Sequence, residues 1–304
     1  MNMLGSILYD TVYHSAPIIL CVIGGIFAYK ANVLNIALEG MMLIGAFVST
    51  LTAYFTHSIL LGVLFAVIAS SLFGLVFSFF GVTCKGNVII TGLAINLLAS
   101  AIAGFILIQM KTSNITLSYL NVADLQIKIP FIKDIPLLGK IISGHPIITY
   151  ISFLGIFLMW LLMYKTKFGI YVRVVGENED AAKSIGLKTD FYKYAAVMIG
   201  AVCCGLAGAD LSTERLGLFT NSMTAGRGFI AIAAIYCGSG SPVKSALFAI
   251  LFGLARSLSV NLSIYAGPAS GLFDIIPYIM MVCVLTFVSV LKYKNSKLRG
   301  FKYE

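Results

Sequence analysis

Long apolar runs, separated by short charged segments, are the main feature of the chain. No Asp, Glu, Lys or Arg occurs over residues 41–84, and further charge-free runs cover 86–110, 146–164 and 275–291. A helix needs about 20 apolar residues to cross the hydrocarbon core of a bilayer, so the first run is long enough for two crossings. Strands of a membrane barrel would alternate apolar and polar residues, and stretches such as 147–164 do not. The pattern predicts an all-α, polytopic bundle of membrane-spanning helices.

The runs divide the chain into about eight or nine transmembrane helices within one domain, residues 1–304. The expected helices cover 12–29, 41–56, 59–83, 88–110, 147–164, 192–211, 226–238, 245–260 and 272–291. Segment 226–238 is short for a full crossing and has glycines at both ends. Such a segment is typical of a broken or re-entrant helix that is buried among its neighbours.

Composition and charge support the same class and add an orientation. Hydrophobic residues make up 59% of the chain and charged residues only 11%, against about 25% charged in soluble domains. The deficit excludes a soluble globular protein and a nucleic-acid-binding domain, although the net charge is +9. Short Lys- and Arg-rich loops remain cytoplasmic. We therefore expect the basic loop at about 165–191 and the C-terminus to be cytoplasmic, and the loop at about 111–146 and the N-terminus to be extracytoplasmic.

The basic loop contains a predicted short amphipathic helix over residues 177–185. Asn178 suits the N-cap position, acidic residues follow it in the first turn, and Gly186 suits a left-handed stop. Such a helix fits a groove on a soluble partner, whereas a solvated loop with no partner is the alternative.

The loop is part of a wider resemblance to a known family. Its matching positions are Gly176-Glu177-Asn178, Ala181-Ala182 and Gly186, followed by an apolar helix that ends in residues 205–209. Further matches are residues 32–42 (NVLNIALEGMM), 226–233 (GRGFIAIA) and the turn at 238–242 (GSGSP). In this order, the motifs resemble the permeases of ABC importers for branched-chain amino acids, ribose and nucleosides, and in particular the nucleoside and simple-sugar branch.

The resemblance implies a permease subunit of a bacterial ABC importer, in the plasma membrane, that moves a small polar solute, in the first place a nucleoside. Ribose-type sugars and branched-chain amino acids are alternative solutes. The implied partners are an ATPase subunit, a second and paralogous permease subunit that makes a heterodimer, and an extracytoplasmic solute-binding protein. The implied ATPase-coupling residues are Glu177, Asn178, Asp180, Ala181, Ala182 and Gly186.

Four polar residues at membrane depth are candidates for the translocation path: Asn35, Glu39, Asn96 and Arg227. Polar groups in hydrocarbon are costly unless they face a cavity or a partner. Asn35 and Glu39 share one face if their segment is helical, and either a path role or the pinning of a broken helix explains them. Arg227 and Arg256 are expected to pair with Asp210, Glu214 or Asp274.

No pattern for catalysis or cofactor binding is found in the chain. The three histidines are scattered without metal-ligand spacing, the six cysteines form no C-x-x-C pair, and no P-loop motif occurs. We therefore expect no enzyme activity, no metal and no cofactor, with ATP used only by the partner ATPase. An ion-coupled secondary transporter is the alternative from another class, and it would require paired intramembrane carboxylates.

Overall fold

The computed structural model describes residues 3–127, 139, 141, 143–264 and 267–298. Within these residues, eight helices are long and apolar enough to cross a membrane, and a ninth, shorter apolar helix accompanies them. The long ones are α1 (Met3–Lys30), α2 (Leu38–Thr56), α3 (Ile59–Ser78), α4 (Val88–Gln109), α6 (Ile147–Lys165), α9 (Thr189–Ala209), α11 (Pro242–Ser263) and α12 (Ile276–Leu298). The short one is α10 (Arg227–Cys237). All nine predicted helices are confirmed, and the fold is the expected polytopic bundle.

Several shorter elements connect or extend these helices. Two π-helical segments, η1 (Phe79–Thr83) and η3 (Asp210–Leu216), continue α3 and α9, and two 3-10 segments, η2 (Val122–Leu125) and η4 (Gly267–Ile275), lie in connections. Helices α7 (Lys167–Glu177) and α8 (Glu179–Ser184) follow α6. Strands β1 (Asn114–Thr116) and β2 (Leu218–Thr220) pair antiparallel, with Ile115 opposite Phe219. This small sheet was not predicted, since three-residue strands carry too few side chains for a recognisable alternation.

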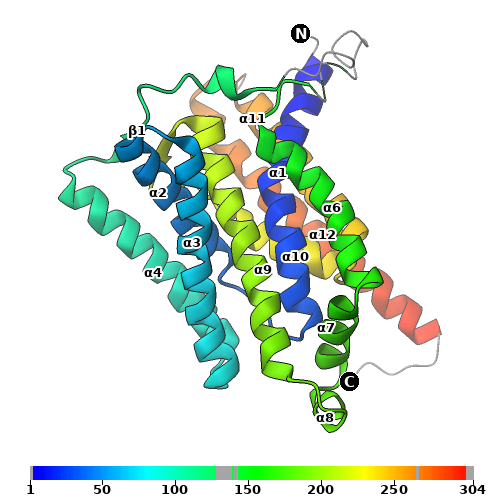
Figure 1. Cartoon of the computed structure of the whole chain (residues 1–304). Helices are drawn as coiled ribbons and strands as arrows, with labels where there is room; N and C mark the ends of the chain where they lie inside the picture. The colour runs from blue at the N-terminus through cyan, green and yellow to red at the C-terminus, as the bar shows by residue number, and fades with distance from the viewer. Residues whose placement is uncertain (1–2, 128–138, 140, 142, 265–266, 299–304) are drawn as a thin grey trace.

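Helix α9 lies at the centre of the bundle and packs closely on α1, α2 and α3 (Figure 1). Small residues make this possible. A side chain at Gly208 would clash with the carbonyl oxygen of Met42, and one at Gly24 would lie 2.9 Å from the Cα of Gly200. Without a hydrophobic driving force between helices in lipid, such close backbone packing is a main source of helix association.

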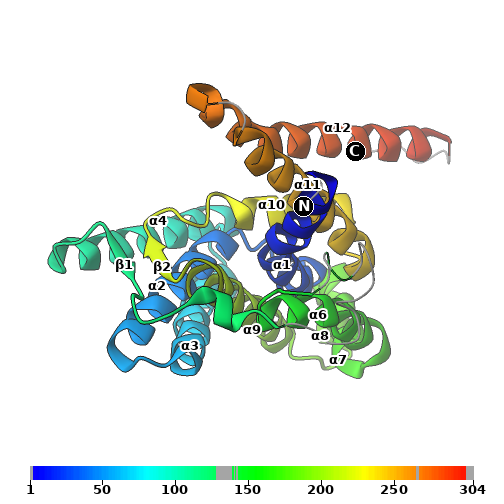
Figure 2. The same cartoon turned by 90° about the horizontal axis from the view of Figure 1, so that it is seen from above.

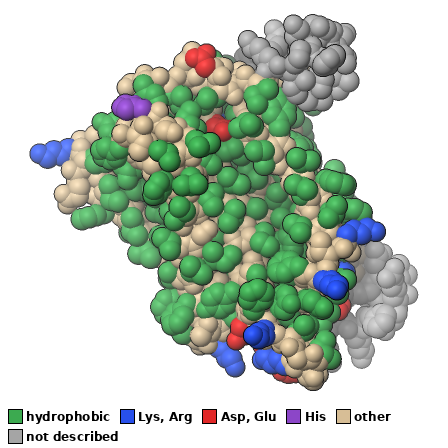
Figure 3. All heavy atoms as spheres, viewed as in Figure 1, with side chains coloured by type: hydrophobic (Ala, Val, Ile, Leu, Met, Phe, Trp, Pro, Cys, Tyr) green, Lys and Arg blue, Asp and Glu red, His purple; other side chains and the backbone are tan. Residues whose placement is uncertain are grey.

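The outer helices present apolar side chains to their surroundings. Only 22% of the most apolar stretch of α3 and of α4 is buried, and only 6% of that of α12, against 83% for α1. Hydrophobic side chains cover the middle of the face in Figure 3, while most of the visible Lys and Arg lie near the end that carries α7 and α8. An apolar middle with charged residues near one end is typical of a protein whose central part is surrounded by lipid.

The two ends of the bundle differ in the segments they carry. The N-terminal end of α1 lies at one end, together with β1, whereas α7, α8 and the C-terminal end of α12 lie at the other (Figure 1). Helix α10 has only 11 residues and spans part of the bundle, so the preceding residues 217–226 complete its passage. The half-helix therefore counts as one crossing, in agreement with the start of α1 and the end of α12 lying at opposite ends of the bundle (Figure 1).

Candidate functional site

The chain is interrupted between α1 and α2, and Asn96 of α4 holds the interrupted backbone. The Asn96 Oδ1 atom accepts a hydrogen bond from the backbone N–H of Gly40 at 2.7 Å, and its Nδ2 atom donates to the carbonyl oxygen of Ile36 at 3.1 Å. One amide thereby satisfies a donor and an acceptor that the break leaves without helical partners. A backbone N–H or C=O group without a hydrogen-bond partner in a bilayer costs on the order of several kcal/mol.

Glu39 performs a similar task at the second interruption, which precedes α10. Its Oε1 atom accepts from the backbone N–H of Gly226 at 2.9 Å, and its Oε2 atom accepts from Gly228 N–H at 2.6 Å. Glu39 also lies in the first turn of α2. One carboxylate thus lies between the N-termini of α2 and α10, where both helix dipoles favour a negative charge.

The glycines at this junction are required by its geometry. Gly226 has φ +73°, and a Cβ on Gly228 would lie 2.5 Å from the backbone nitrogen of Glu39. Arg227, between them, is buried and donates to the carbonyl oxygens of Met223 and Thr224 at 2.9 and 3.1 Å. The guanidinium therefore holds the turn before α10, and its hydrogen bonds go to the backbone and not to a carboxylate.

Asn35 occupies a different place from the other three candidates. Helix α2 begins only at Leu38, and Asn35 Oδ1 accepts from the backbone N–H of Ala37 at 3.0 Å as part of the turn. The segment between Asn35 and Leu38 is not helical, so the condition under which Asn35 and Glu39 would share a helix face is not met. Asn35 is buried and lines a narrow cavity between α1, α2 and α10, together with Tyr29 and Ile232.

The basic loop forms the predicted short helix, with slightly different bounds. Helix α8 starts at Glu179, Asn178 Oδ1 accepts from the backbone N–H of Ala181 at 2.9 Å, and Gly186 ends the segment at φ +83°. Glu177 belongs to the end of α7. The N-cap and the left-handed stop are thus where the sequence predicted them.

Glu179 anchors α8 to the start of α9. Its carboxylate accepts from Lys183 at 2.7 Å and from Lys193 at 2.5 Å. Hydrogen bonds from Lys183 and from Lys193 lower the pKa of Glu179 to about 2. The acidic first turn therefore serves to fix the helix to its own chain, besides its favourable position at a helix N-terminus.

The exposed face of α8 is not the one that small side chains suggested. Ala182 is fully buried, whereas Ala181 and Ser184 are exposed and Ile185 is 69% exposed. Ala181 and Ser184 lie on one face of the helix, and Ile185 follows them at its C-terminal end. The methyl group of Ala182 packs against its own chain, whereas the assignment of Ala182 to ATPase coupling stays a prediction. The exposure of the apolar side chain of Ile185 was not predicted from the sequence.

Residues 7–285 match the family described as "Branched-chain amino acid transport system / permease component". The chain belongs to this permease family. The match covers both interruptions, the α7–α8 segment and the membrane helices, except for the first residues of α1 and the second half of α12. The polytopic helical fold and the role of a transport component follow from this membership.

Three relatives show the breadth of the family around this permease. The guanosine ABC transporter permease protein NupQ of Bacillus subtilis is 33% identical over 96% of this chain and 92% of its own length. The nucleoside ABC transporter permease protein NupC of Lactococcus lactis is 32% identical over 94% and 92%. A putative glucose ABC transporter permease protein, TsgC13 of Haloferax volcanii, is 28% identical over 96% and 92%. No solved structure matches the chain.

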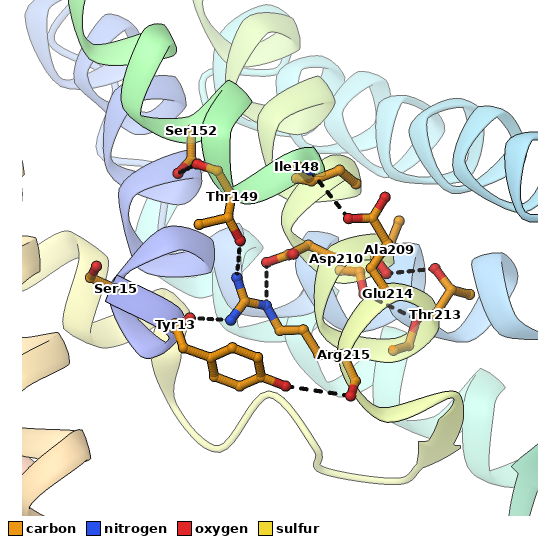
Figure 4. A network of polar contacts seen from close by, with 12 residues as sticks. Tyr13, Ser15, Ile148, Thr149, Ser152, Ala209, Asp210, Thr213, Glu214 and Arg215 are labelled. Carbon is orange, nitrogen blue, oxygen red and sulfur yellow. Dashed lines mark hydrogen bonds and ion pairs between the residues drawn. The ribbon is translucent and has the colours of Figure 1, made fainter. Parts of the chain in front are cut away.

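The permease also contains a buried charged cluster that the sequence did not reveal (Figure 4). Arg215 Nε lies 2.7 Å from Asp210 Oδ2, with both side chains almost completely buried. Arg215 also donates to the carbonyl oxygen of Tyr13 and, at 2.8 Å, to Thr149 Oγ1. Asp210 was expected to pair with Arg227 or Arg256. It pairs with Arg215 because both lie on the π-helix η3, where residues five apart are neighbours.

The other two carboxylates that were expected to pair with Arg227 or Arg256 are Asp274 and Glu214. Arg256 donates to Asp274 at 2.7 Å, as the sequence indicated. Glu214 accepts from the backbone N–H of Ile148 at 3.2 Å, where α6 begins, and lines an apolar groove between α3 and α6. The cluster on η3 thereby connects α9 to α1 and α6, and it fixes the end of the bundle opposite α8.

Proposed function

We propose that this chain is the transmembrane permease subunit of an ABC importer for nucleosides, with ATP hydrolysed by a partner subunit. The observation that carries the ABC assignment is the family match over residues 7–285, together with the relatives named as ABC transporter permeases. We propose α8, with the 69% exposed Ile185 that follows it, as the docking surface for the ATPase subunit. The nucleoside assignment rests on the two relatives named for guanosine and nucleosides.

The proposed orientation places α8 and the C-terminus in the cytoplasm. In the proposed topology, the loops and helix ends on this side carry six lysines: Lys30, Lys85, Lys167, Lys183, Lys188 and Lys292. Short basic loops favour the cytoplasm, so the ATPase docks on α8 from this side. The extracytoplasmic solute-binding protein docks at the opposite end, next to β1 and β2.

The proposed second permease packs on the side of the bundle where α12 lies. Helix α12 stands at the edge of the bundle when it is seen from above (Figure 2), and its most apolar stretch is 6% buried. A paralogous chain at this side would bring two half-helices α10 towards one shared path. We propose a heterodimer, because the resemblance of this chain is to the branch in which two related permeases assemble.

Glu39, Asn96 and Arg227 act, in this proposal, by holding the two helix interruptions beside the path. Their polar atoms already have partners on their own chain, which favours pinning over direct contact with the solute. Asn35 is the candidate that we propose for solute contact, because it lines the narrow cavity next to α10, although its side-chain oxygen also accepts from Ala37.

A transport assay tests the proposal. The complete importer is reconstituted into proteoliposomes, and accumulation of labelled guanosine, glucose and leucine is compared with and without ATP on the α8 side. Guanosine accumulation that requires ATP is expected. Glucose accumulation alone would favour a sugar importer, the second candidate, which the relative named for glucose supports. Uptake driven by an ion gradient without the ATPase would refute the ABC assignment.

A further inference from the structure

A cavity of about 560 Å³ opens where α1, α6, α7 and α10 meet, at the end of the bundle that carries α8. Its volume lies within the range of about 300–1,000 Å³ that is typical of small-molecule sites. The side chains that give it its chemistry are Tyr29, Lys30, Tyr164, Arg173, Glu177 and Tyr236. The cavity adjoins the narrow cavity beside Asn35, with which it shares Tyr29 and Tyr236, but its charged residues have no role in the proposed path.

Two cations from different helices line the cavity. Lys30 ends α1 and Arg173 lies in α7, and the two are close enough to interact electrostatically. A third cation, Lys292 of α12, donates to the carbonyl oxygen of Tyr236, whose side chain is another part of the lining. Glu177 is the only carboxylate among the described residues that line the cavity. Positive charge therefore prevails at this site.

Both lining cations retain hydrogen-bonding capacity. Lys30 Nζ makes one hydrogen bond, to the carbonyl oxygen of Ser239 at 3.1 Å, and an ammonium group has three donors. Arg173 Nε donates to Gly169 of its own helix, and its guanidinium lies over the ring of Tyr164 at 5.0 Å. Within the described part of the chain, its terminal N–H groups have no acceptor. These free donors match the several oxygens of a phosphate group.

The cavity lies at the base of the segment proposed to contact the ATPase. Gly176 of α7 touches the carbonyl oxygen of Lys30 so closely that any Cβ would clash with it. Asn178 and α8 follow directly. A ligand that bridged Lys30 and Arg173 would therefore join α1 to α7 and restrain the attachment of α8.

We propose that this cavity binds a phosphate-bearing anion from the cytoplasmic side and that its occupation slows ATP-driven transport by clamping α7 to α1. The phosphate comes either from a soluble nucleotide, whose base suits the tyrosine rings, or from the headgroup of an anionic lipid. The inference rests on the proposed function for the side on which α8 lies and for the ATPase partner, but not on the identity of the solute.

The test measures ATP hydrolysis by the complete importer in nanodiscs, with and without its binding protein and solute. Guanosine 5′-monophosphate and inorganic phosphate are titrated in zwitterionic lipid, and phosphatidylglycerol is added to the lipid in a separate series. The variants are Lys30→Gln and Arg173→Gln. Lys165→Gln is the matched control, because Lys165 belongs to the same end of the bundle but lies over Trp160, outside the cavity.

We expect the anion to slow ATP hydrolysis by wild type and by the Lys165→Gln control at a concentration at least about tenfold lower than for the two cavity variants. The reason is that each cavity variant lacks charge-assisted hydrogen bonds to the anion. Slowing by phosphatidylglycerol in wild type and control alone would identify a lipid as the source. Slowing by the soluble anions alone would identify a nucleotide.

Equal slowing of all four proteins would refute the proposal, because the anion would then act at the ATPase. An absence of slowing under every condition would refute it as well. If Lys30→Gln does not assemble, Arg173→Gln decides alone, since the Arg173 side chain donates only within its own helix. Hydrolysis is measured without solute too, so a wrong assignment of the solute leaves this test intact.

Discussion

Replacement of Glu39 by Gln tests whether the junction of α2 and α10 depends on a carboxylate. The two oxygens accept from Gly226 and Gly228 at 2.9 and 2.6 Å. A glutamine has one acceptor oxygen, and its NH2 group would face an N–H group. The substitution thus removes one charge-assisted hydrogen bond and weakens the other. With about 1.5–3 kcal/mol for each such bond, we expect a loss of about 2–4 kcal/mol.

The assay is the unfolding midpoint of the assembled importer in detergent, followed by the loss of its monodisperse peak on heating. Glu39→Gln should lower the midpoint by several degrees, and Glu39→Asp should lower it less because the charge remains. Asp124→Asn is the matched control, since Asp124 is an exposed carboxylate in the η2 segment. An unchanged midpoint for Glu39→Gln would refute pinning. If uptake alone then falls, Glu39 belongs to the translocation path.

Three further predictions concern α8 and the buried cluster. Ile185→Asp should abolish co-purification of the ATPase and leave the permease's unfolding midpoint unchanged, and a retained ATPase would contradict the docking surface. Arg215→Met leaves the buried Asp210 without its partner and should cost about 3–5 kcal/mol, as read from the same unfolding midpoint; an unaltered midpoint would show that the pair is dispensable. Because the pKa of Glu179 is lowered to about 2 from 4.5, its hold on α8 is complete above about pH 4.5 and is lost as the pH falls towards 2. The rate of hydrogen exchange in α8 should therefore rise as the pH falls over that range. The loss of protection should not exceed about 1 kcal/mol, because solvent screens the carboxylate. In a Glu179→Gln variant, the exchange rate corrected for its intrinsic pH dependence should not change with pH.

The sequence predicted those parts of the fold that depend on long or strongly marked local patterns. Apolar runs of about 20 residues predict spanning helices directly, and all nine were found at nearly the expected positions. The cap at Asn178 and the stop at Gly186 are local as well, because both depend on the conformation of one or two residues. Such features need no knowledge of the neighbouring helices.

The remaining features depend on contacts between distant segments. The carboxylate of Glu39 was recognised as important, but its partners lie 187 and 189 positions away. The burial of Ala182 could not be read from the sequence, because it depends on how the six-residue helix α8 packs against its neighbours. The Asp210–Arg215 pair was missed because its spacing of five is typical of a π-helix, which an apolar pattern does not distinguish from an α-helix.

The continuity of α9 with its flanking elements has a mechanical consequence. From Thr189 to Leu216 the chain forms one uninterrupted helical rod of 28 residues, about 40 Å long at 1.5 Å per residue. At one end, four residues separate it from α8; at the other, Gly217 leads into β2, which is paired with β1. Such a continuous element can carry a displacement from one end of the bundle to the other. In the proposed orientation, a movement of α8 should therefore reach the β1–β2 sheet, so that the ATPase side and the solute side are coupled through one helix.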